Sequence, residues 1–68
     1  MILKDYLKVN NFTQQGFSDE VEKVFGKKIP QGTLAKYVNG QRIPRKPEMK
    51  LIYDFTHGKV SPNDFYLS

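Results

Sequence analysis

The chain has no cysteine and no tryptophan, and His57 is its only histidine. Without cysteine it can form neither a disulfide framework nor a thiolate metal site, and one imidazole cannot supply the paired ligands of most zinc centres. Apolar runs stop at two or three residues, so no signal-peptide profile or membrane-spanning stretch is recognisable. We therefore expect a cytoplasmic protein that is stabilised by packing, with at most the help of a partner chain.

A chain of 68 residues has the length of one small domain, which hides roughly 60 % of the surface that its unfolded form exposes. Hydrophobic residues make up 38 % of the chain and include five Phe and four Tyr, enough for a single compact core. The charged fraction of 26 % is ordinary for a globular protein and unlike that of a disordered chain. We expect residues 1–68 to fold as one domain.

Positive charge is concentrated in the middle of the chain. The net charge is +4, yet residues 1–26 and 51–68 each carry −1 and residues 27–50 carry +6, with Glu48 as their only acid. Such a distribution fits a polyanionic partner, because phosphates that are neutralised by Lys and Arg release counterions. A solvated charged face is the alternative that charge alone leaves open.

Apolar residues recur at three- to four-residue spacing, which predicts an all-α fold of five short helices. We expect helices over residues 2–9, 14–25 and 31–38, a fourth with Pro47 and Glu48 in its first turn, and a last turn over residues 61–67. The expected inward positions are Ile2, Leu3, Tyr6, Leu7 and Val9 in the first helix, Phe17, Val21, Val24 and Phe25 in the second, and Met49, Ile52, Tyr53, Phe55 and Thr56 in the fourth.

The second helix has signals at both ends. Thr13 is suited to cap it, with Phe12 and Phe17 forming a hydrophobic staple, and Gly26 is suited to end it. A glycine at position 16 weakens the helix interior, so a start at Ser18 stays open.

The segment 31–38 has an unusual surface for a purely structural helix, because its first turn is small, amide-bearing and uncharged. Two closely joined helices, the second with short polar side chains at its start, can place a helix N-terminus in the major groove of DNA. Here that pair covers about residues 14–38. Gln31 can bridge N6 and N7 of adenine, Thr33 offers a hydroxyl and a methyl, and Lys36 can reach guanine or phosphate.

Gly32 permits close approach, so the candidate base contacts are Gln31, Gly32, Thr33 and Lys36; plain solvent exposure is the alternative. A basic, proline-punctuated loop over residues 41–47 follows this helix. Arg42, Arg45 and Lys46 are candidates for phosphate contact there, as are the backbone amides at Asn39-Gly40. The same cations are also compatible with a role in solubility alone.

At these segments the chain resembles the lambda-repressor-like helix-turn-helix family, which includes the Cro and repressor proteins of lambdoid phages and many small bacterial regulators. The resemblance spans most of residues 3–66 and rests on three stretches, Thr13-Gln14-x-x-Phe17-Ser18, Thr33-Leu34-x-x-Tyr37-x-Asn39-Gly40-x-Arg42-x-Pro44 and Val60-Ser61-Pro62-x-Asp64-Phe65. The combination in this order is more specific than any one stretch.

The resemblance implies a sequence-specific transcriptional regulator of duplex DNA, Cro-like or a short repressor, in the cytoplasm and nucleoid of a bacterial host cell. It implies that Gln14 contacts a phosphate and that the first residues of the third helix read bases. The full set of expected phosphate contacts is Gln14, Lys28, Asn39, Arg42, Arg45 and Lys46. One copy reads few base pairs, so we expect a homodimer on a palindromic operator. No cofactor, small-molecule ligand or membrane is expected.

The chain departs from the family between Ser18 and Leu34, where it has about six additional residues. Either a longer second helix or an expanded turn over residues 26–30 accommodates them. We expect the longer helix, with Lys27 and Lys28 facing solvent or the DNA backbone.

Two other classes of function remain to be weighed. A protein-interaction module, such as an antitoxin or anti-repressor that meets an acidic protein, would depend on the tail over residues 65–68 and tolerate a neutral loop. Phe65, Tyr66 and Leu67 either cover the core or lie bare for a partner chain. An enzyme is disfavoured, because the sequence has no nucleophile–base pair, metal-ligand spacing or phosphate-cradling glycine loop.

Overall fold

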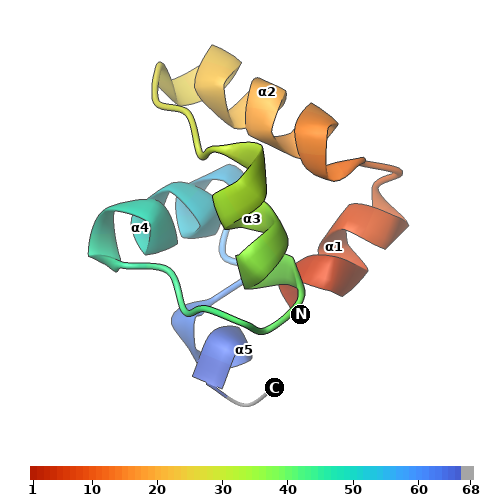
Figure 1. The fold of residues 1–68 in the computed structure, drawn as a ribbon, viewed down its shortest axis with the longest axis vertical. Coiled ribbons are helices and arrows are strands. Elements are labelled where there is room, and N and C mark those ends of the chain that lie inside the picture. Colours follow the sequence, from red (N-terminus) through yellow and green to blue (C-terminus); the bar gives the residue numbers. More distant parts are fainter. Residues whose placement is uncertain (67–68) are drawn as a thin grey trace.

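The computed structural model describes residues 1–66, and over this range the fold has five helices and no strand. The helices are α1 (Leu3–Val9), α2 (Gln14–Phe25), α3 (Gln31–Val38), α4 (Lys46–Phe55) and α5 (Pro62–Tyr66), as Figure 1 shows. The expectation of an all-helical fold is confirmed. The basic loop is shorter than predicted, because α4 already begins at Lys46. None of the helices in the described range has the length and apolar character needed to cross a membrane.

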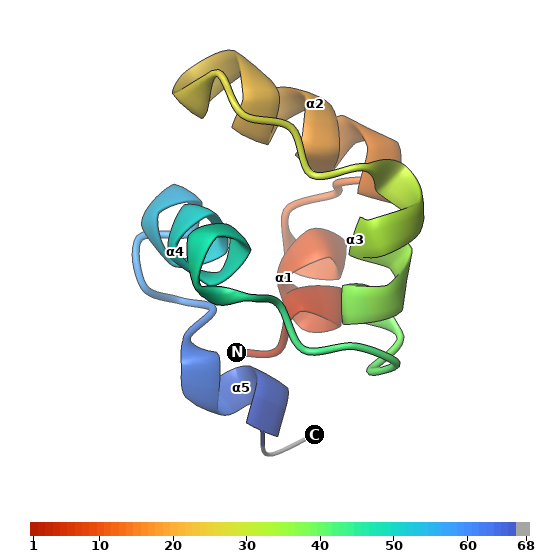
Figure 2. The same cartoon turned by 60° about the vertical axis from the view of Figure 1, so that its left-hand side comes forward.

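The third helix lies at the periphery of the molecule. α3 is at the front of Figure 1 and at the edge of Figure 2, where α2 crosses above its first turn. It contacts α2 and α1, and the chain that leaves it passes round to α4. One long side of α3 consequently faces away from the rest of the protein.

Phe17 of α2 lies at the centre of the core and is completely buried. Its ring meets those of Phe12, Tyr6 and Phe55 edge-on, at centroid distances of 5.7, 6.2 and 5.1 Å. Since Phe12 directly precedes the cap residue Thr13, its contact with Phe17 is the predicted hydrophobic staple. This cluster joins α1, α2 and α4 around one point.

The start of α2 is capped as predicted. The Gly16 N–H donates to Oγ1 of Thr13 at 2.9 Å, so the helix begins at Gln14 and not at Ser18. A Cβ atom at position 16 would lie 3.0 Å from that same hydroxyl oxygen, so the Thr13 side chain would have to shift slightly to admit one.

Five of the expected inward positions are wrong, since Ile2, Val9, Val24, Phe25 and Tyr53 are exposed. Val9 and Val24 are in the last turns of α1 and α2, which extend beyond the core, and periodicity alone does not reveal where the core ends. At the other end of the chain, Phe65 is buried and covers the core, whereas Tyr66 is exposed. Leu67 lies outside the described residues.

The connection between α2 and α3 folds back along α2, as Figure 2 shows. Gly26 ends α2 in the left-handed conformation, with φ of 72°. Ile29 is completely buried, and its carbonyl accepts a hydrogen bond from the buried Ser18 hydroxyl. The predicted bounds of the second helix, residues 14–25, are confirmed, and residues 26–30 form a non-helical returning segment on which Lys27 and Lys28 are exposed.

Replacing Ser18 by Ala is expected to destabilise the fold by about 0.5–2.5 kcal/mol. The buried Ile29 carbonyl then loses its partner, at a cost of about 1–3 kcal/mol, and the better helix propensity of Ala offsets about 0.5 kcal/mol of it. Urea denaturation followed by circular dichroism measures the difference. Gln15→Ala, an exposed change on the same helix, is the control and should stay within about 0.5 kcal/mol of the wild type; equal stabilities of the two variants would contradict the expectation.

Candidate functional site

The N-terminal end of α3 has no side-chain cap, because Pro30 occupies the cap position. The first hydrogen bond of the helix runs from the Leu34 N–H to the Pro30 carbonyl at 2.9 Å. The N–H groups of residues 31–33 precede that bond and have no acceptor within the helix. Gln31 and Gly32 are exposed here. This end of α3 thus presents backbone donors and the positive end of the helix dipole to solvent.

Gly32 has no structural role that its surroundings reveal. A Cβ atom there would meet no other atom within 4 Å, and its backbone does not need a positive φ. Glycine nevertheless costs a helix up to about 1 kcal/mol relative to Ala. The open space in front of this backbone is available to another molecule.

Beside the first turn of α3 lies a hollow of about 250 Å³, here called the basic hollow. Thr33 and Tyr37, four residues apart on one side of α3, line it together with residues from both adjoining segments. The complete lining is Lys28, Pro30, Thr33, Tyr37, Arg42, Arg45 and Glu48. Three cations that are separated in sequence therefore meet at one place, opposed by a single acid.

Tyr37 combines a buried ring with an available hydroxyl. The residue is only 4 % exposed, and its hydroxyl makes no hydrogen bond to another residue in the described range. Burial, and after it the Glu48 carboxylate, raise the pKa of Tyr37 above its usual value, against the opposite effect of Arg42 and Arg45. The phenol is protonated at neutral pH and can act as a donor.

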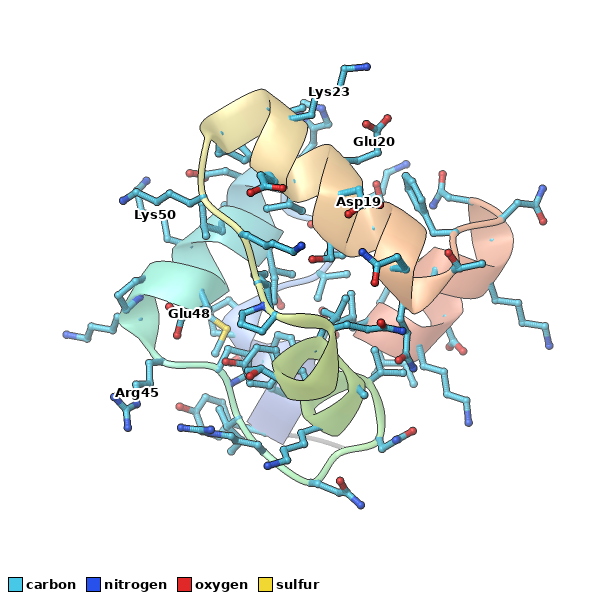
Figure 3. All side chains as sticks on the ribbon, turned by 45° about the horizontal axis from the view of Figure 1, so that its top comes forward. Asp19, Glu20, Lys23, Arg45, Glu48 and Lys50 are labelled. Atoms are coloured by element: carbon cyan, nitrogen blue, oxygen red, sulfur yellow. The ribbon has the colours of Figure 1, made fainter. Side chains whose placement is uncertain are left out.

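Apart from Glu48, the acidic side chains do not line the basic hollow. Figure 3 shows Asp19 and Glu20 along α2 together with Lys23, well away from Arg45, which extends outward just before α4. Glu48, in the first turn of α4, is the exception on the basic side. The charge asymmetry of the sequence thus becomes an asymmetry between two regions of the surface.

The structure brings together part of the predicted site. Gln31, Gly32 and Lys36 are exposed on α3 and Thr33 is half-buried, so the predicted base-contact set stays accessible. Lys28, Arg42 and Arg45 meet at the basic hollow. The other predicted phosphate contacts are not part of its lining: Gln14 is half-buried at the start of α2, Asn39 lines a depression between α1, α3 and α5, and Lys46 lines a groove along α4 and α5.

Sequence reasoning missed three residues. Tyr37 and Glu48 line the basic hollow, and neither was among the predicted contacts. Ala35 is half-buried on α3, one turn after Gln31. Helical spacing was the available signal, because Tyr37 follows Thr33, and Ala35 follows Gln31, by four residues.

Comparisons of this chain with protein-family models, with curated proteins and with solved structures find no match. Residues 1–66 contain no group of three or more His, Asp or Glu side chains placed to hold a metal ion.

Glu48→Gln is expected to lower the pKa of Tyr37, because the carboxylate that helps to raise it is gone while Arg42 and Arg45 remain. An alkaline NMR titration of the labelled tyrosine ring carbons measures this pKa. Asp54→Asn is the control, since Asp54 is paired with Lys50 at 3.1 Å and is not part of the hollow. An unchanged Tyr37 pKa in Glu48→Gln would mean that the two side chains are not neighbours.

Proposed function

We propose that this chain is a sequence-specific regulator of transcription that binds duplex DNA through the first turn of α3. The observation that carries the proposal is the exposed, uncapped start of α3 beside a hollow to which the preceding and following segments contribute three cations. A base-reading helix has to enter the groove between two phosphate backbones, so it needs cations alongside it.

The outward side of α3 is suited to the major groove. Gln31 can accept and donate to adenine N6 and N7, and Lys36 can donate to guanine O6 and N7. Between them, Gly32 lets the backbone approach and the Ala35 methyl fits the methyl group of thymine. Thr33 faces the basic hollow, so its hydroxyl serves the backbone edge rather than the bases.

In the proposed complex, phosphate contacts supply most of the affinity for DNA. Lys28, Arg42 and Arg45 neutralise phosphates next to the bases that α3 reads, with Gln14, Asn39 and Lys46 as outer contacts. Each neutralised phosphate contributes about −0.9 to the slope of log affinity against log salt. Three contacts at the hollow give a slope of about −3 for each copy of the chain.

Useful specificity requires two copies, because one α3 reads few base pairs. We place them as a homodimer on the two halves of a palindromic operator, about one helical turn apart. Occupation of the operator blocks polymerase sterically, as expected for the lambda-repressor-like proteins that the sequence resembles.

A protein-interaction module is the second candidate. The groove along α4 and α5, lined by Met49, Tyr53 and Pro62, favours it, because apolar surface is left exposed there. Neutralising Arg42 and Arg45 together separates the candidates: a DNA-binding regulator loses its affinity for DNA, whereas partner binding through the groove persists.

Gln31→Ala is expected to weaken binding to the preferred duplex by about 1–3 kcal/mol and to change binding to other duplexes much less, since it removes a base contact. Arg45→Ala should weaken all duplexes alike and reduce the salt slope by about one, since it removes a phosphate contact. Selection from a random duplex pool, followed by fluorescence anisotropy at several salt concentrations, measures both. No preferred sequence after selection, or affinity without salt dependence, would refute the proposed function.

Gly32→Ala is expected to separate stability from binding. The exposed change should stabilise the fold by about 0.5 kcal/mol through helix propensity and weaken DNA binding, because the new methyl group occupies the space that DNA needs. Denaturation and anisotropy on one preparation report the two effects. Gln15→Ala, at the equivalent second position of α2, is the control that should leave binding unchanged; unchanged binding in Gly32→Ala would contradict close approach at this glycine.

A further inference from the structure

The basic hollow has the features of a built anion site, beyond a gathering of cations. We propose that the three cations of the hollow neutralise neighbouring phosphates of the DNA backbone, that the Tyr37 hydroxyl donates a hydrogen bond to an oxygen of one of these phosphates, and that Glu48 limits the affinity. This assignment rests on the proposed DNA-binding function and adds to it a neutral donor and an opposing charge.

The first support is the position of Tyr37. Its ring is held in the core at 4 % exposure, so the direction of the C–O bond is set by packing rather than by a flexible side chain. Tyr37 lines the hollow, the charges of Glu48, Arg42 and Arg45 act on its phenol, and its hydroxyl has no hydrogen-bond partner among residues 1–66. A donor that is already oriented loses little entropy when it binds an acceptor.

The second support is the placement of the cations around this donor. Arg42 and Arg45 enter from the loop after α3, and Lys28 enters from the segment before it. The backbone at Lys28 is anchored by its neighbour Ile29, which is buried and bonded to Ser18. A phosphate has several oxygens and can meet cations on opposite sides of the hydroxyl. The arrangement therefore suits a phosphate ligand better than a carboxylate ligand.

Glu48 lowers the positive charge of the basic hollow and so limits its affinity for phosphate. Its carboxylate lines the same space, so the net charge there is one lower than the three cations alone provide. The carboxylate also helps to keep Tyr37 protonated, since it raises the pKa of that phenol. Glu48 therefore weakens phosphate binding to every DNA sequence while preserving the donor that orients the phosphate.

The decisive variants change one group each. Tyr37→Phe removes the hydroxyl and keeps the ring, so affinity for all duplexes should fall about tenfold with an unchanged salt slope, because a neutral donor releases no counterion. Lys28→Gln should instead reduce the salt slope by about 0.9.

Glu48→Gln should bind all duplexes about three- to tenfold more tightly. Tyr53→Phe, the same change on the exposed side of α4, is the control and should bind as the wild type does.

A duplex series identifies the phosphate itself. One backbone phosphate at a time is replaced by an uncharged methylphosphonate, and wild type and Tyr37→Phe are titrated against each duplex. At one position in each half-site the two losses should not add, since both changes remove the same hydrogen bond. Additive losses at every position would overturn the Tyr37 contact.

The other possible results distinguish failure of this assignment from failure of the proposed function. DNA binding by the wild type with equal affinity in Tyr37→Phe overturns the hollow as a phosphate site and leaves the proposed function standing. Loss of affinity in Glu48→Gln overturns the role of Glu48, and this test remains valid even if Tyr37→Phe does not fold. A wild type without any DNA affinity overturns the proposed function and this assignment together.

Discussion

The hydrogen bond from the Ser18 hydroxyl to the Ile29 carbonyl, together with the burial of Ile29, holds the connection over residues 26–30 against α2. Because a buried carbonyl without a partner is costly, this connection has one favourable position. That position determines where α3 begins and where Lys28 is placed. Residues 26–30 thus form a returning segment with a defined path.

The same anchoring explains why the polar start of α3 stays open. Leu34 and Tyr37 turn inward and are buried, which leaves Gln31, Gly32 and Lys36 outside. Pro30 cannot cap the helix with a side chain, so the backbone N–H groups of the first turn remain available. The orientation of α3 therefore accounts both for its packing against the core and for the exposure of its first-turn N–H groups.

Local signals in the sequence were sufficient for much of the fold, since Thr13, Gly26 and the spacing of apolar residues act over a few residues. They did not reveal that Val24 is exposed, because the extent of the core depends on how α2 and α4 pack. These local signals did not predict the basic hollow either. Lys28 and Arg42 are far apart in sequence and meet only through the fold, whereas Asn39 and Lys46, close to Arg42 in sequence, line other depressions.

We propose that α3 and the basic hollow together form one DNA-binding surface. The sharpest test is an NMR titration of the labelled protein with its selected duplex. Amide shifts are expected to change over residues 31–36 and 41–45 and at Lys28, with little change along the acidic side of α2. Shift changes confined to α2, or to the groove along α4 and α5, would contradict it.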